Sequence, residues 1–369
     1  MTIEKGLANS DAKDTKTQVN ISQKCRWLSV VAMIAVIIIH CNSIGTFSEA
    51  SWGNRFFQQA FSRVGTSWAV PMFFVISGYW ASQSLQKEAY LQLIWKKVRG
   101  LLVPYICWAI LGALIVLPLI CFNNLVMHRA LLERTVFVQS SVWDFCDALL
   151  GINRGGPMGN LALWYVRTLM LLFLFLPIEH LVVSKLRWGA LMISLILILV
   201  CPSYSIPVVS TECLGIGCFL LGMSLSELRL MKRRLPRSWT IGVVFVWFIC
   251  VVLWTRFSIL EQEPTIPFQH LIPLLGGLMW FGLYDWFGER IRFSVRLERK
   301  TFWVYCLHGV LVGYFVSGGY FILGKTNAVS IILALLSPVL VLAVCLGGGI
   351  ICERYLPRVY RVLIGGRDK

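Results

Sequence analysis

The sequence predicts an all-α protein, a polytopic membrane bundle of about ten transmembrane helices whose N- and C-termini both lie in the cytoplasm. The first observation is composition, because 57% of the 369 residues are hydrophobic and only 14% are charged. Soluble domains carry about 25% charged residues, so this composition excludes a soluble enzyme, a disulfide-rich secreted module and a disordered chain. The second observation is a series of long apolar stretches, and a bilayer core is crossed by roughly 20 residues of helix.

These stretches are apolar on every side and lack the alternation of polar and apolar residues that strands of a β-barrel show, so helices are predicted. Two of them are short and are separated by Pro202 and Pro207. The ten predicted spans cover residues 27–44, 64–83, 101–121, 162–180, 188–202, 209–226, 239–256, 268–287, 301–323 and 329–351.

The third observation is the distribution of positive charge. The chain has 34 Lys and Arg residues against 18 Asp and Glu, which gives a formal net charge of +16. With the N-terminus inside, 26 of the 34 fall in the cytoplasmic segments, 7 in the outer loops and one, Arg167, within a span. Because cytoplasmic loops of membrane proteins are enriched in Lys and Arg, the charge indicates orientation and not a nucleic-acid partner.

The predicted domain organisation is simple. Residues 1–24 are expected to form a disordered cytoplasmic tail, residues 25–355 one membrane domain, and residues 356–369 a basic cytoplasmic tail. The longest outer segment, 122–160, contains the amphipathic stretch SVWDFCDALL and is expected to lie over the outer mouth of the bundle. The twelve cysteines form no CxxC pair and no zinc-finger spacing, so no metal site is predicted.

Two histidines stand inside predicted spans, where an ionisable residue indicates function. His40 ends the first span, about 21 Å along the helix from Arg26, and general base is its natural role because imidazole titrates near neutral pH. An interfacial anchor is the competing interpretation. His308 is expected roughly 10 Å from the cytoplasmic end of the ninth span, so that one histidine lies near each face. A structural histidine competes equally there.

A basic cluster precedes Pro104 at the predicted inner surface. Lys96, Lys97 and Arg99 either determine topology and contact lipid phosphates, or bind a phosphorylated cytosolic substrate. Taken alone, the cluster favours the first interpretation.

Further polar residues lie in the second and fourth spans. Ser77 follows an apolar run, and close helix packing with Gly78 explains it better than catalysis; Tyr79 adds a hydroxyl. Trp164 and Tyr165 fit an aromatic belt at the outer interface. Arg167 either binds an anionic or acceptor group, or extends outward to the interface.

Several of these segments, in this order, resemble the acyltransferase 3 family of integral membrane acyltransferases. The most specific is AVPMFFVISGY, and the resemblance covers residues 27–351. The matching segments are the first span ending in His40, then residues 69–79 (AVPMFFVISGY), 96–105 (KKVRGLLVPY), 163–169 (LWYVRTL), 219–222 (FLLG) and 302–308 (FWVYCLH).

The resemblance implies transfer of an acyl group, usually acetyl from acetyl-CoA, to a hydroxyl of a cell-envelope saccharide or its lipid-linked precursor in the bacterial cytoplasmic (inner) membrane. It implies that His40 deprotonates the acceptor, and that Lys96 and Arg99 contact CoA, with no other bound cofactor. Many members carry Arg eleven residues before this histidine. Here Ser29 occupies that position, and Arg26, one turn earlier, is the nearest arginine, so the resemblance assigns Arg26 to the binding of the acyl donor as well.

A second hypothesis is an exporter of a polysaccharide or a lipid-linked sugar. Ten spans and a polar path through the bundle, formed by the two histidines, would also suit an exporter. An exporter requires neither a proton acceptor nor a CoA site, so His40 together with the basic cluster discriminates between the two.

Overall fold

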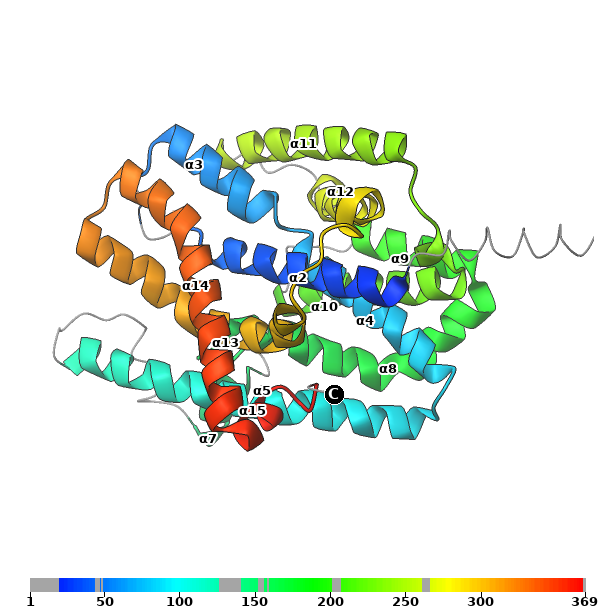
Figure 1. Cartoon of the computed structure of the whole chain (residues 1–369), viewed down its shortest axis with the longest axis horizontal. Coiled ribbons are helices and arrows are strands. Elements are labelled where there is room, and N and C mark those ends of the chain that lie inside the picture. The colour runs from blue at the N-terminus through cyan, green and yellow to red at the C-terminus, as the bar shows by residue number, and fades with distance from the viewer. Residues whose placement is uncertain are drawn as a thin grey trace, which may run out of the picture.

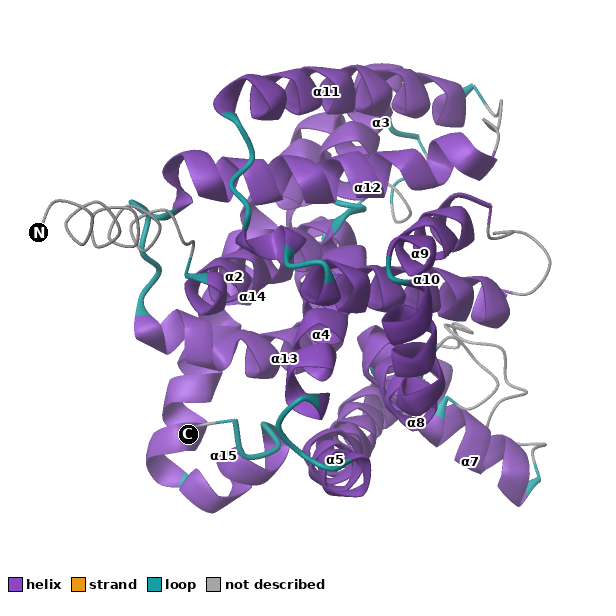
Figure 2. Cartoon of the chain, turned by 90° about the vertical axis from the view of Figure 1, so that its right-hand side faces the viewer, coloured by secondary structure: helices purple, strands orange, loops and turns teal. Residues whose placement is uncertain are grey.

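The computed structural model describes residues 20–43, 47, 49–125, 141–151, 156–157, 159–200, 207–260 and 266–367. Within these residues every regular element is a helix and no strand occurs (Figures 1 and 2). The long helices are α2 (Ile21–His40), α4 (Ala69–Leu85), α5 (Tyr90–Leu125), α8 (Trp164–Leu186), α9 (Trp188–Val200), α10 (Pro207–Glu227), α11 (Arg237–Ile259), α12 (Ile266–Leu283), α13 (Val295–Leu323) and α14 (Asn327–Tyr355).

Each of the ten predicted spans overlaps one of these helices, and the all-α prediction is confirmed within the described residues. Within the described part of the chain, six helices are long and apolar enough to cross a membrane by length and composition. The count of about ten crossings and the cytoplasmic placement of both termini stay predictions. The six are α2, α8 together with the 3-10 turn η3 (Leu161–Leu163), the first part of α5, α11, α13 and α14.

The remaining elements are short. They are α3 (Trp52–Gln58), the π-helical η2 (Gln59–Val64), α7 (Val142–Leu150), the 3-10 turn η4 (Leu230–Lys232), the π-helical η5 (Tyr284–Gly288) and α15 (Pro357–Leu363).

Side-chain caps mark where several helices begin. The Asn20 side chain accepts a hydrogen bond from the backbone of Gln23 at the start of α2, and Ser294 and Thr326 cap α13 and α14 in the same way. Such caps bond backbone N–H groups that have no partner in the first turn.

The bundle exposes apolar side chains on its outer surface. In both overall views α11 and α5 lie at opposite edges, with α2, α4 and α10 between them (Figures 1 and 2). The edge helix α11 exposes Trp239, Phe245 and Phe248 by 60% or more. Exposed apolar helix surface of this kind is typical of contact with lipid, so the chain is a multi-pass membrane protein.

Small residues bring α4 and α10 into close contact. Gly78 of α4 faces the backbone of Phe219, and Gly222 of α10 faces the backbone of Val75. A methyl group at either glycine would collide with the opposing carbonyl. Gly78 therefore serves helix packing, as predicted for this part of the second span.

A buried ion pair fixes the start of α2. Lys24 Nζ lies 2.7 Å from Asp285 Oδ1 of η5 and 3.0 Å from the ring centroid of Phe281, and both charged side chains are at most 1% exposed. The expectation that the tail extends through residue 24 is therefore wrong for Ile21–Lys24, which form the first turn of α2. The apolar contact of Ile21 with the core and the ion pair of Lys24 hold these residues in the helix. Residues 1–19 lie outside the described part of the chain.

Candidate active site

His40 and His308 lie side by side inside the bundle, and we call them the histidine pair. Their ring centroids are 5.3 Å apart, with 50° between the ring planes. The expectation of one histidine near each face is wrong. Helix α13 begins at Val295 and not at residue 301, which places His308 about 20 Å along the helix and level with the end of α2.

The two histidines differ in exposure and in hydrogen bonding. His40 is solvent-accessible at the end of α2, whereas His308 is fully buried. His308 Nδ1 lies 2.5 Å from the carbonyl oxygen of Tyr305, which only accepts, so Nδ1 carries the proton. Nε2 of His308 is then the acceptor nitrogen and has no hydrogen-bond partner among the described residues.

A buried polar cluster holds the chain immediately after His40. Ser43 Oγ contacts Gln58 Oε1 and Ser330 Oγ, each at 3.0 Å, and the hydroxyl of Tyr320 lies 2.9 Å from Ser43 Oγ. Gln58 Nε2 closes the network by donating to Ser330 Oγ at 2.7 Å. The network joins the end of α2 to α3, α13 and α14, so it fixes the position of His40.

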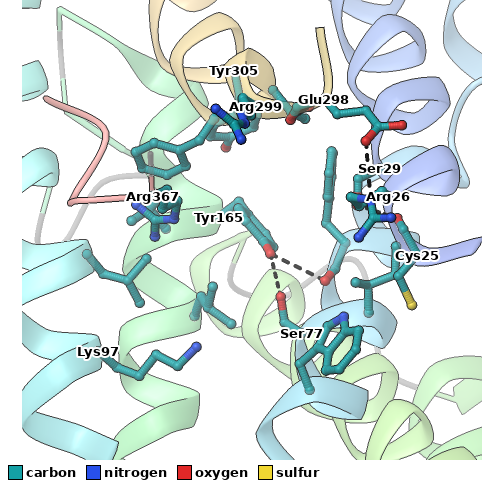
Figure 3. A pocket seen from close by; sticks show the side chains of 18 of the residues that line it. Cys25, Arg26, Ser29, Ser77, Lys97, Tyr165, Glu298, Arg299, Tyr305 and Arg367 are labelled. Atoms are coloured by element: carbon teal, nitrogen blue, oxygen red, sulfur yellow. Dashed lines mark hydrogen bonds and ion pairs between the residues drawn. The ribbon is translucent and has the colours of Figure 1, made fainter. Parts of the chain in front are cut away.

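A cavity of about 760 Å³ lies between α2, α4, α5, α8 and α13, and we call it the basic pocket (Figure 3). Its polar lining residues are Ser22, Cys25, Arg26, Ser29, Ser77, Lys97, Tyr165, Glu298, Arg299, Thr301, Tyr305 and Arg367.

The pocket carries an excess of positive charge. Arg26, Lys97, Arg299 and Arg367 line it, against the single carboxylate of Glu298. Arg26 Nε lies 3.2 Å from Glu298 Oε2, and no ion pair involves the other three cations within the described residues. Figure 3 shows Lys97 and Arg367 on the side opposite Arg26 and Glu298. This charge favours an anionic ligand.

Three aromatic side chains that line the basic pocket pack together, and one of them, Tyr305, contacts the histidine pair. The rings of Tyr165 and Tyr305 are 5.7 Å apart, and Phe73 contacts both. The ring of Tyr305 also lies 5.7 Å from the ring of His308, and the backbone carbonyl oxygen of Tyr305 accepts the hydrogen bond from His308 Nδ1. Tyr305 therefore belongs to the pocket wall and to the surroundings of the histidine pair at once.

The basic cluster predicted on α5 divides between two faces of that helix. Lys97 lines the pocket on the same face as the buried Leu93 and Leu101. Lys96 pairs with Glu88 at 2.7 Å and is 63% exposed, and Arg99 is exposed beside Trp95. Successive helical residues point about 100° apart, so Lys96 and Arg99 point away from the pocket into which Lys97 extends.

Arg26 and Ser29 also share one helix face and line the pocket together. Arg26, one turn before the position where the family is expected to carry arginine, therefore lines the same pocket as Ser29, which occupies that position. The guanidinium of Arg26 additionally donates to Ser22 Oγ at 2.6 Å.

The aromatic-belt interpretation is wrong for Tyr165. Its hydroxyl lies 2.9 Å from Ser77 Oγ and donates to the carbonyl of Phe73, so it is buried within the bundle (Figure 3). Trp164 is half-buried and contacts Phe74. Both residues belong to the first turn of α8, which directly follows the buried Ala162 and Leu163 of η3. Ser77 thus lines the pocket beside Tyr165, whereas Tyr79 packs in the core outside it.

Arg167 holds the end of the outer segment. It donates to the carbonyl oxygen of Gly151, and Tyr105 donates to that of Leu150, so both bind the C-terminal end of α7. A positive charge is stabilised at the C-terminal end of a helix, where the helix dipole is negative. Asn160, 1% exposed, donates to the carbonyl oxygen of Cys306 at 2.8 Å. Asn160, at the end of segment 122–160, therefore lies inside the bundle. Residues 126–140, 152–155 and 158 are outside the described ranges, and the placement of the segment over the outer mouth stays a prediction.

Sequence reasoning missed Arg299, Arg367 and Tyr305 as site residues. The spacing of Leu93, Lys97 and Leu101 by four residues could have indicated Lys97, because it places the lysine on the same helix face as two buried leucines. Arg367 carried no such signal.

Comparison with protein families gives a match to the acyltransferase domain of the acyltransferase 3 family over residues 26–352. The match covers nearly the whole chain and includes both histidines. Comparisons with curated proteins and with solved structures gave no significant match. The chain, a multi-pass helical bundle with a basic pocket beside a histidine pair, belongs to the acyltransferase 3 family of membrane acyltransferases.

Proposed function

We propose that the protein is an O-acyltransferase that moves an acyl group, acetyl in the simplest case, from cytosolic acyl-CoA to a hydroxyl of a cell-envelope saccharide or its lipid-linked precursor. The membrane is the bacterial cytoplasmic membrane. The observation that carries the proposal is Tyr305, which lines the basic pocket and contacts His308. A donor held by its phosphates in this pocket therefore shares a wall residue, Tyr305, with the histidine pair.

The donor half of the proposal rests on charge. CoA is polyanionic, and Lys97 and Arg299 line the pocket without ion-pair partners among the described residues. Guanidinium and ammonium groups bind phosphate oxygens through charge-assisted hydrogen bonds. The apolar lining around Phe73 and Leu169 suits the less polar pantetheine and acyl part.

The acceptor half rests on His40. Its imidazole takes the proton of the acceptor hydroxyl, and the oxygen attacks the carbonyl carbon of the thioester. The C–S bond breaks, and the CoA thiolate leaves and receives the proton from His40. His308, whose Nδ1 is bound to the Tyr305 carbonyl, positions His40 by contact between the rings. An exporter has no requirement for a proton acceptor beside a cationic pocket, so the arrangement favours transfer chemistry.

The function is tested by the ester-linked acetate of the envelope saccharides. Cells lacking the protein are complemented with the wild type or with His40→Gln, and alkali-released acetate is measured in the saccharide fraction. We expect acetate to be restored by the wild type alone. Equal acetate in cells with and without the protein would refute acetyl transfer to this class of acceptor.

The two neighbouring lysines of α5 separate a pocket role from a topological one. Lys97→Gln is expected to weaken acetyl-CoA binding about tenfold, the effect of one charged hydrogen bond. Lys96→Gln is the matched control and should leave the affinity within about twofold, because the Lys96 side chain is 63% exposed and does not line the pocket. Calorimetric titration of both purified variants measures the difference, and a larger loss in Lys96→Gln would contradict the assignment.

A further inference from the structure

The segment after α14 folds back onto the bundle. Tyr360 of α15 is 3% exposed, packs against the ring of Trp303 at 5.2 Å, and its hydroxyl lies 3.2 Å from Lys300 Nζ. Lys300 in turn pairs with Glu353 of α14 at 2.5 Å. Trp108 of α5 donates to the carbonyl oxygen of Leu363 at 3.0 Å. The segment is thus fixed to α5, α13 and α14.

A glycine turn then directs the chain toward the basic pocket. Gly365 and Gly366 have φ values of 65° and 70°, which L-residues with side chains rarely adopt. Gly365 lies against the backbone of Gly100 in α5, where an added Cβ would collide with the carbonyl. The turn therefore depends on glycine for its conformation and for its close approach to α5.

Arg367 follows the turn and enters the basic pocket (Figure 3). Its Nη1 donates to the carbonyl oxygens of Gly100 at 2.9 Å and Ile364 at 2.6 Å, and its guanidinium carbon lies 3.9 Å from the ring centroid of Phe302. The surrounding protein lowers the pKa of Arg367 below its usual value, and the group stays cationic at neutral pH.

These contacts leave binding capacity on the guanidinium. Of its five N–H donors, the hydrogen bonds found within the described residues use only those of Nη1. No carboxylate in the described part of the chain pairs with it, whereas Arg26, across the pocket, is paired with Glu298. A fixed cation in an open cavity beside Lys97 is suited to an anion.

We propose that Arg367, which lies outside the matched acyltransferase domain, is a donor-binding residue that contacts a phosphate group of CoA in the basic pocket. The inference rests on the proposed function and extends it, because the docked segment 356–367 then completes the pocket of the domain that ends at residue 352. Arg367 and Lys97 bind the anion from the same side, and the Gly365–Gly366 turn sets their spacing.

The test is calorimetric titration of free coenzyme A into the purified full-length protein in lipid nanodiscs. Arg367→Gln is expected to weaken binding about tenfold, whereas Arg358→Gln should stay within about twofold of the wild type. Arg358 lies in the same segment, is exposed and does not line the pocket, so it is a matched control for charge. Unchanged melting temperatures show that both variants are folded.

Gly365→Val tests the docking without removing a charge. It should weaken binding as much as Arg367→Gln, and the double variant should show no further loss. Wild-type affinity in Arg367→Gln overturns this inference and leaves the proposed function intact. Equal losses in Arg367→Gln and Arg358→Gln also overturn it, because they indicate a general charge effect. Absence of coenzyme A binding to the wild type overturns both the donor assignment and the inference.

Discussion

Replacing His40 by glutamine is expected to lower the rate of acyl transfer by about 10²–10⁴-fold, the usual contribution of a general base. Glutamine keeps the size and a hydrogen-bonding group but cannot take the proton of the acceptor hydroxyl at neutral pH. The affinity for coenzyme A should stay unchanged, because His40 is not among the residues that line the basic pocket. Transfer of radiolabelled acetyl to membrane saccharides, with parallel calorimetry, measures both quantities.

The matched variant is His308→Gln. His308 is fully buried and bonded to a backbone carbonyl, so it positions His40 without meeting the acceptor. We therefore expect a smaller loss of rate in His308→Gln than in His40→Gln, together with a changed pH profile. The opposite order of the two variants would make His308 the base and contradict the assignment of His40.

Replacing Asp285 by asparagine is expected to lower the free energy of unfolding by about 3–5 kcal/mol. The reason is the charge left behind on Lys24, which is 0% exposed at the start of α2. Asparagine preserves an oxygen that can accept the backbone N–H of Leu235, now bound by Asp285 Oδ2 at 3.1 Å. Thermal unfolding in detergent measures the effect.

Two further variants test whether the loss of stability comes from the burial of the unpaired charge or from the loss of any ion pair. The double variant Lys24→Met with Asp285→Asn removes the stranded charge and should recover much of the stability. Glu289→Gln breaks the exposed pair with Arg234, whose side chains are 40% and 39% exposed, and should cost at most about 1 kcal/mol. A similar loss in Asp285→Asn and Glu289→Gln would show that burial of the first pair is not decisive.

The helices were predictable because their signal is local. A run of about 20 apolar residues is helical in lipid whatever its neighbours are, since every backbone group must be bonded within the segment. His40 was predictable for a related reason, because an ionisable residue at the end of such a run is unfavourable unless it has a role. The resemblance of the surrounding motifs agreed with that reasoning.

The pairing of His308 with His40 was not predictable from either span alone. The pairing depends on where α13 begins. The helix begins six residues before the predicted start and includes polar residues such as Arg299 and Lys300. Hydropathy locates the apolar part of a helix and not its ends. The depth of His308 was therefore misplaced by about two turns.

By itself, the sequence determined that this chain is a multi-pass helical membrane protein and where the apolar part of each helix lies, and it identified His40 as a candidate. Only the tertiary structure decided which cations share a cavity, that Lys97 and Arg367 face it while Lys96 and Arg99 do not, and that the histidines meet. The physical reason is that apolarity acts on each segment separately. The contents of a pocket, in contrast, depend on helix rotation and on contacts between residues far apart in the chain, such as Arg367 with Gly100.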